Sequence, residues 1–119
     1  MDKIIIWHNP RCSKSREGLA MTEKIRQEKN IEIDIIKYIN NPPTAKKLKE
    51  VLKMLDMKPI DLVRVKEAIW KENFKGKDLT DAQIIQAMAD NSKLIERPIV
   101  IYKNKAVLAR PAEKVIELF

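Results

Sequence analysis

The sulfur of Cys12 is the side chain in this sequence with the clearest capacity for covalent chemistry. An apolar segment over residues 4–7 runs into a turn that contains Pro10, and a helix-compatible segment begins directly after the thiol. This order predicts a cysteine at a helix N-terminus, where backbone N–H groups and the helix dipole stabilise negative charge. Nearby cationic groups favour the thiolate further and predict a lowered thiol pKa; they are His8, Arg11, Lys14 and Arg16.

Cys12 is also the only cysteine. A lone cysteine is more often a half-buried structural residue, and this interpretation stays open beside that of a reactive thiol. A chain with one cysteine cannot form an internal disulfide, which fits a reducing compartment. If the thiol is oxidised during turnover, the resolving thiol must come from another molecule.

Three arginines stand next to predicted element boundaries. Arg64 follows a short apolar stretch, whereas Arg97 and Arg110 each precede a proline. Arginine suits a tetrahedral oxyanion because its planar fork donates two hydrogen bonds and keeps its charge. Guanidinium groups beside a thiolate would attract an anionic substrate and stabilise charge that develops on its oxygens. Spacing alone leaves open whether these arginines meet Cys12 or form surface ion pairs.

The composition describes one globular domain. The 119 residues are 45% hydrophobic and 34% charged, and a chain of this length buries a sizeable core. The longest early apolar run, over residues 4–7, is too short for a signal peptide or a membrane span, so we expect a cytoplasmic protein with no membrane association. The sequence offers no Cys/His cluster, so no metal is expected. Nothing demands more than a monomer.

The formal net charge of +7 is concentrated in the middle of the chain. Acidic residues interrupt the lysines of segment 44–58, and no aromatic residue interleaves with them. We therefore interpret this segment as a solvated helix face and expect no nucleic-acid partner. A nucleic-acid site would also carry clustered positive charge, so the charge alone does not separate the two interpretations. Whether the helix docks another partner is open. The positive field favours small anions.

The first part of the chain is predicted to be a βαβ unit. Residues 3–7 and 31–39 are rich in β-branched side chains and bounded by turn signals, which predicts strands. A helix is predicted from residue 13 to about residue 27, and Gly18 would let it approach a sheet closely. Two strands joined by a helix should be parallel, with a right-handed crossover.

The middle of the chain is predicted to be helical. Thr44 is the expected N-cap of a helix through residue 55, and Pro59 is expected to open a short helix that includes Arg64. Thr80 and Gln83 match a capping box for a helix to about residue 90. Its expected inward side chains are Ile84, Ile85 and Met88.

The last third is predicted to be a hairpin and a helix. Strands over residues 99–102 and 106–109 should flank a loop over 103–105. Pro111 suits the first position of a final helix, whose expected buried side comprises Val115, Ile116 and Phe119. We therefore predict a single α/β domain over residues 1–119, ordered β-α-β, a helical insertion at about 44–92, then β-β-α, with a mixed four-stranded sheet.

Several segments of the chain, taken in order, resemble the arsenate reductase (ArsC) family of the glutathione/glutaredoxin-dependent type. They are His8-Asn9-Pro10-Arg11-Cys12-Ser13-Lys14-Ser15-Arg16, Asn41-Pro42-Pro43, Asp61-Leu62-Val63-Arg64, Glu96-Arg97-Pro98-Ile99-Val100 and Ala109-Arg110-Pro111-Ala112-Glu113-Lys114-Val115. The resemblance implies a thioredoxin-like fold with a helical insertion after the second strand.

The resemblance also implies roles for individual residues. The nucleophile of the family falls on Cys12, His8 lies near the thiol and tunes it, and Ser15 is positioned to hydrogen-bond the thiolate. Pro98 falls on the cis-proline that faces the active-site turn. The three oxyanion-binding arginines of the family fall on Arg64, Arg97 and Arg110.

The implied reaction is the reduction of arsenate, or a similar oxyanion, to arsenite. The thiolate attacks arsenic(V), glutathione attacks the adduct and reduces the arsenic, and glutaredoxin supplies the final thiol. Glutathione is then a co-substrate, and no bound cofactor is expected.

Two other functions stay open at the level of the sequence. One is a glutathione-linked thiol oxidoreductase with another substrate. The other is a non-catalytic, ArsC-like transcriptional regulator that binds RNA polymerase. That branch typically carries a Cys-x-x-Cys pair, whereas the later position of the pair is Ser15 in this sequence. The sequence also has all three arginines of the enzyme family, which favours the enzyme.

Overall fold

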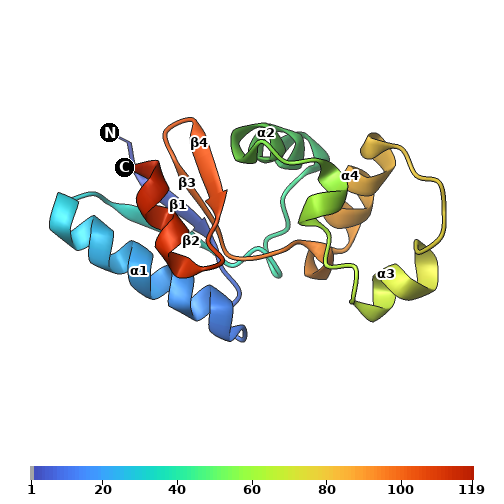
Figure 1. The fold of residues 1–119 in the computed structure, drawn as a ribbon, viewed down its shortest axis with the longest axis horizontal. Coiled ribbons are helices and arrows are strands. Elements are labelled where there is room, and N and C mark those ends of the chain that lie inside the picture. Colours follow the sequence, from blue (N-terminus) through green and yellow to red (C-terminus); the bar gives the residue numbers. More distant parts are fainter. Residues whose placement is uncertain (1) are drawn as a thin grey trace. The chain divides into compact units, whose positions relative to one another are not determined.

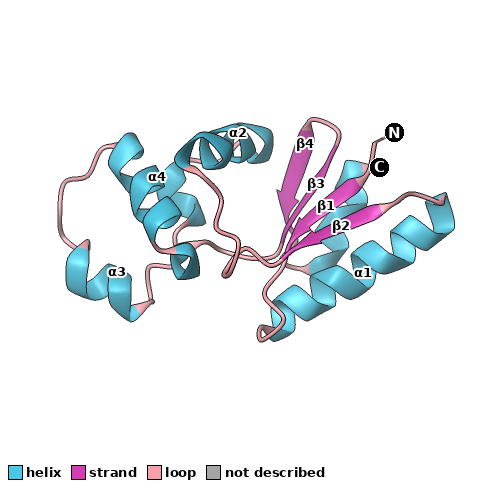
Figure 2. Cartoon of the chain, turned by 180° about the vertical axis from the view of Figure 1, so that it is seen from behind, coloured by secondary structure: helices cyan, strands magenta, loops and turns pink. Residues whose placement is uncertain are grey.

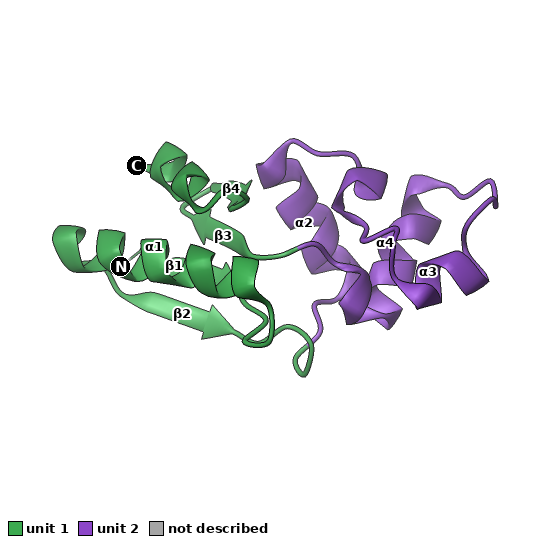
Figure 3. Cartoon of the chain, turned by 60° about the horizontal axis from the view of Figure 1, so that its bottom comes forward, with its two compact units in different colours: residues 1–41, 97–119 green, residues 42–96 purple. Residues whose placement is uncertain are grey.

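The computed structural model describes residues 2–119, which group into two compact units. Unit 1 combines the residues up to 41 with residues 97–119, and unit 2 comprises residues 42–96 (Figure 3). The helical insertion expected at about 44–92 falls within unit 2. That both units form a single domain stays a prediction. No helix within residues 2–119 has both the length and the apolar character that crossing a membrane requires.

Unit 1 is built on a four-stranded mixed sheet, as predicted. The strands lie in the order β2-β1-β3-β4 (Figure 2). β1 pairs in parallel with β2 and antiparallel with β3, which pairs antiparallel with β4. The strands are β1 (Ile4–Trp7), β2 (Ile33–Ile36), β3 (Ile99–Tyr102) and β4 (Lys105–Leu108).

Strand β2 is shorter than the predicted span of 31–39. It lies at one edge of the sheet and pairs only with β1, which offers four residues. The ladder ends where the partner strand ends, although the apolar pattern of the sequence continues. As an edge strand, β2 leaves Ile35 40% exposed.

Helix α1 (Ser13–Lys29) and the 3-10 helix η3 (Ala112–Leu118) pack side by side on one face of this sheet (Figure 1). Each buried isoleucine or valine of their shared core contributes about 1.5–3 kcal/mol. The buried members of this core are Ile4, Ile6, Ile25, Val100, Ala109, Val115 and Leu118.

The final helix buries a different side from the one predicted. Val115 and Leu118 are buried, whereas Ile116 is 56% and Phe119 39% exposed. The expected set followed α-helical spacing, but η3 is a 3-10 helix with three residues per turn, so positions i and i+3 share a face. Pro111 precedes the first helical residue as its N-cap instead of occupying it.

The hairpin turn is one residue shorter than predicted. Tyr102 pairs with Lys105 across β3 and β4, which leaves Lys103 and Asn104 as a two-residue loop. Lys103 has a φ of 57°, as two-residue hairpin turns require at their first position.

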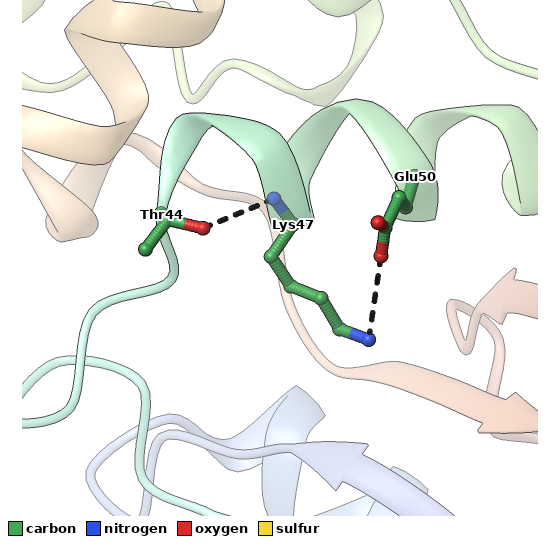
Figure 4. Close-up of polar contacts among 3 residues, drawn as sticks. All are labelled: Thr44, Lys47 and Glu50. Carbon is green, nitrogen blue, oxygen red and sulfur yellow. Dashed lines mark hydrogen bonds and ion pairs between the residues drawn. The ribbon is translucent and has the colours of Figure 1, made fainter.

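Unit 2 is helical. Its helices are α2 (Ala45–Leu55), the 3-10 helix η1 (Pro59–Leu62), α3 (Ala68–Asn73), α4 (Asp81–Asp90) and the 3-10 helix η2 (Ser92–Leu94). The hydroxyl of Thr44 accepts a hydrogen bond from the Lys47 backbone N–H at 3.1 Å, which caps α2 as predicted (Figure 4). The capping box of Thr80 and Gln83 is present on α4.

Two details of unit 2 differ from expectation. Helix η1 ends at Leu62, so Arg64 lies beyond the short helix and not inside it. The buried side chains of α4 are Ile84, Ala87 and Met88, and Ile85 is only half-buried. Spacings of i, i+3 and i+4 define one face of an α-helix, and Ile85 lies beside that face.

Gly18 lies where α1 closely approaches Pro98, in the segment before β3. A Cβ atom built on Gly18 would collide with the ring of Pro98 and would contact the Cβ of Ala109 at 3.5 Å. The close approach that the sequence predicted is therefore made against Pro98.

Replacement of this glycine should therefore destabilise the fold. In a helix, Gly→Ala ordinarily stabilises by about 0.5–1 kcal/mol. We expect Gly18→Ala to lower the free energy of unfolding by about 1–3 kcal/mol, because the added methyl group overpacks the contact with Pro98. Urea denaturation measures this change, with exposed Ala20→Gly on the same helix reporting propensity alone. A gain of stability in Gly18→Ala would show that the contact does not constrain α1.

Candidate active site

Cys12 is the N-cap residue of α1. Its backbone is extended, with φ −102° and ψ 125°, and its side chain makes no capping hydrogen bond. Its carbonyl accepts from the N–H of Arg16 at 3.0 Å, and its own N–H donates to the carbonyl of Asn9 at 3.0 Å. The backbone N–H groups of the first helical turn are left available to the sulfur.

The pKa of the Cys12 thiol reflects opposing influences. Burial is the largest single influence and raises the pKa. The backbone N–H of Ser15, the charge of Arg97, the backbone N–H of Lys14 and a side-chain hydrogen bond from Arg97 all lower it. Together these groups hold the pKa of Cys12 below its ordinary value, because each one favours the thiolate.

Arg97 reaches this sulfur from the segment before β3. It is half-buried, and its peptide bond to the buried Pro98 is cis. The Pro98 carbonyl accepts from the N–H of Ala109 at 2.9 Å, which ties the segment to the end of β4. The structure thus brings one of the three predicted arginines to the thiol.

The other two arginines lie on other segments of the chain. Arg110 is exposed after β4, and its peptide bond to Pro111 is also cis, which the sequence did not predict. Arg64 belongs to unit 2, where it forms ion pairs with Glu67 and Glu96. Their binding of an oxyanion stays a prediction.

Ser15 is fully buried and joins the end of β1 to α1. Its Oγ lies 2.8 Å from Nδ1 of His8 and accepts from the backbone N–H of Asn9 at 2.9 Å. The resemblance placed the Ser15 hydroxyl on the thiolate. In the structure, the backbone N–H of Ser15 lowers the Cys12 pKa, and the hydroxyl bonds His8 and Asn9.

His8 is buried, with 5% of its surface exposed. Burial is the main cause of its lowered pKa, and the charges of Lys37 and Arg16 act in the same direction against a backbone hydrogen bond at Ser15. A pKa below 6.5 leaves the ring neutral at neutral pH. His8 therefore does not supply the positive charge that the sequence suggested, and its connection with Cys12 runs through Ser15.

Two further side chains fix the loop before Cys12. Asn9 Oδ1 accepts from the N–H of Arg11 at 3.1 Å, and Arg16 Nη1 donates to the carbonyl of Pro10 at 2.8 Å. Neither hydrogen bond was predicted from the sequence, which suggested only a charge for Arg16. The Asn-Pro pair was the available signal, because asparagine commonly bonds the backbone two residues on.

The thiolate stabilisation predicts a pH profile. Alkylation of Cys12 by iodoacetamide, followed by mass spectrometry, should have a midpoint below the pKa of about 8.5 of free cysteine. Arg97→Gln should raise the midpoint, because it removes a charge and a hydrogen-bond donor. Exposed Arg11→Gln is the matched control and should leave it unchanged, because Arg11, contrary to the expectation from the sequence, is not among the groups that lower the pKa of Cys12 in the structure. A wild-type midpoint equal to that of free cysteine would contradict the geometry.

The buried hydroxyl predicts a stability loss. Ser15→Ala should lower the free energy of unfolding by about 1–3 kcal/mol, because it leaves the Asn9 N–H and His8 Nδ1 without their buried partner. Exposed Ser13→Ala, two residues away, should stay within about 0.5 kcal/mol of wild type. Thermal or urea unfolding compares the two, and equal effects would show that the Ser15 bonds contribute nothing.

Comparisons with known proteins agree with this architecture. The ArsC family model matches residues 7–118. The chain is 42% identical to an uncharacterized Escherichia coli K12 protein named YfgD, over 98% of this chain and 96% of that one. It is 37% identical to an arsenate reductase of Neisseria meningitidis, covering 97% of each. A solved arsenate reductase structure from Vibrio cholerae superposes with a TM-score of 0.87 at 38% identity, over 99% of this chain and 98% of that one. The chain therefore belongs to the ArsC family and has its thioredoxin-like fold.

Proposed function

We propose that this protein is an arsenate reductase that uses the Cys12 thiolate as its nucleophile and glutathione and glutaredoxin as thiol donors. The observation that carries the proposal is the environment of Cys12, where two backbone N–H groups and Arg97 lower the thiol pKa. The arsenate reductases of N. meningitidis and V. cholerae, which align over nearly the whole chain, support the choice of substrate.

The first step is attack of the Cys12 thiolate on arsenic(V). A sulfur–arsenic bond forms, and one arsenate oxygen leaves as hydroxide or water. Arg97 contacts the sulfur and carries a fixed positive charge, so it offsets the repulsion between a thiolate and an anionic substrate. Arg64 and Arg110 would add guanidinium donors for the remaining oxygens.

The second step transfers electrons to arsenic. A glutathione thiolate attacks the Cys12 sulfur and breaks its bond to arsenic. The electron pair of that bond stays on arsenic, which becomes arsenic(III) and leaves as arsenite. A mixed disulfide between Cys12 and glutathione remains.

The third step regenerates the enzyme. A glutaredoxin thiolate attacks the glutathione sulfur of the mixed disulfide, and Cys12 leaves as a thiolate. The leaving thiolate is favoured because its pKa is lowered. The chain contains no second cysteine that could act in its place.

The test is arsenate-dependent NADPH oxidation, coupled through glutathione, glutathione reductase and glutaredoxin. We expect turnover by wild type, none by Cys12→Ser, and unchanged turnover by Glu50→Gln, which alters an exposed ion pair on α2. Removing glutaredoxin from the mixture should abolish cycling, because the mixed disulfide then accumulates. Mass spectrometry identifies that species.

A second variant separates the proposal from a general thiol oxidoreductase. Arg64→Ala should abolish arsenate turnover. Thiol–disulfide exchange between Cys12 and a glutathione mixed disulfide should survive in the same variant. No arsenate turnover by wild type, together with fast alkylation of Cys12 at neutral pH, would indicate a thiol oxidoreductase with a different substrate. Copurification with RNA polymerase would indicate a regulator.

A further inference from the structure

Helices α2 and α4 pack against each other in unit 2 and border a surface groove of about 490 Å³. From α2 the groove is lined by Lys49, Leu52 and Lys53, whose spacing of i, i+3 and i+4 places them on one face of the helix. Residues 56–59 add the C-cap of α2 and the turn that follows it, and α4 adds Asp81 and Ile85. A groove of this volume lies within the range of about 300–1,000 Å³ that is typical of ligand-binding pockets.

Part of this groove is apolar. Leu52 and Pro59 are buried, whereas Met57 and Ile85 are half-buried. Ile85 was expected to face the core, but the core side of α4 is formed by other residues, and Ile85 lines the groove instead. An apolar side chain that covers Met57 and Ile85 would remove their surface from water, which favours binding.

Lysines border the apolar part of the groove. Lys49, Lys53 and Lys58 are exposed, and none of them belongs to an ion pair within residues 2–119. Lys47 on the same helix differs, because it pairs with Glu50 at 3.8 Å (Figure 4). The ammonium groups along the groove are therefore available to carboxylates of another molecule.

Two aspartates in the same groove indicate which kind of anionic partner fits. Asp56 and Asp81 are exposed and, like the lysines, take part in no ion pair among the described residues. An ionised carboxylate accepts hydrogen bonds and donates none. The backbone N–H groups of a polypeptide can donate to these two aspartates, whereas the phosphates of a nucleic acid or a lipid would be repelled by them. None of the described residues that line the groove is an aromatic on which a base could stack.

We propose that this groove docks an acidic polypeptide segment of another protein. The apolar side chains of the segment cover Met57 and Ile85, and its carboxylates face the three lysines. Complementary charge of this kind accelerates association and orients the partner, while the apolar contact adds affinity. The inference goes beyond the proposed function, because no residue of the groove has a part in the reduction of arsenate.

The experiment is fluorescence anisotropy of the full chain with a labelled short peptide in which pairs of glutamates flank two leucines. We expect saturable binding that weakens as the ionic strength rises. The same peptide with serines in place of the leucines should bind about fivefold or more weakly, because it lacks the apolar contact. A version with lysines in place of the glutamates should not bind.

Paired charge variants locate the binding site. Lys49→Gln/Lys53→Gln should weaken binding of the acidic peptide about fivefold or more, because two ion pairs with it are lost. The matched control is Lys71→Gln/Lys75→Gln, which removes the same charge at the same sequence spacing from exposed residues of unit 2 outside the groove. The control should leave the affinity unchanged.

A second pair of variants tests the apolar contact. Ile85→Thr should weaken binding of the acidic peptide about threefold to fivefold, because apolar surface in the groove is lost. Ile35→Thr is the matched control, since Ile35 is 40% exposed and belongs to unit 1. Circular dichroism of each variant establishes that the helices are retained.

The inference is overturned if the acidic peptide shows no saturable binding, or if the serine peptide binds equally well. It is also overturned if the two lysine double variants lose the same affinity, or if folded Ile85→Thr binds as wild type does. A single-stranded oligonucleotide is the last comparison. If it binds more tightly than the acidic peptide and loses affinity in Lys49→Gln/Lys53→Gln, the groove is a nucleic-acid surface and the proposal is wrong.

Discussion

The hydrogen bonds of one buried hydroxyl, Ser15 Oγ, determine how strand β1 passes into helix α1. They join His8, which directly follows the strand, to the loop residue Asn9 and to the first turn of the helix. The sulfur of Cys12 can face the backbone N–H groups of Lys14 and Ser15 only if this turn is held. The reactivity of the thiol therefore depends on a residue whose own side chain takes no part in the chemistry.

Two consecutive residues contribute to the surroundings of Arg64 and of Cys12. Glu96, the last residue of unit 2, pairs with Arg64, and the next residue, Arg97, contacts Cys12 in unit 1. The backbone bonds from Leu62, Arg64 and Leu94 hold one side of this segment, and the Pro98 carbonyl holds the other through Ala109. The backbone hydrogen bonds thus fix the segment that carries the positive charge before any ligand binds. Binding then costs less conformational entropy than it would if the ligand itself had to order this segment.

Much of this architecture could be predicted from residue patterns, because the determining interactions are local. The βαβ order, the N-caps at Thr44 and Thr80, and Cys12 at a helix N-terminus follow from periodicity and capping rules and are present. The extent of β2 depended on its partner strand, and the buried side of η3 depended on its helix type. The partners of the Ser15 hydroxyl and of Arg64 join residues through three-dimensional contacts, which spacing does not encode.

The pairing of β1 with β3 has a consequence for the order in which the chain can fold. Ile4 pairs with Tyr102, nearly 100 residues further along the chain. Synthesis delivers β1, α1 and β2 early, but the strand that completes the centre of the sheet is made only after unit 2. Contacts of such sequence separation carry a loop-closure entropy that local contacts avoid, and they slow folding. The apolar edge of β1 thus stays without its antiparallel neighbour for most of translation, whereas the helices of unit 2 can form from a contiguous stretch.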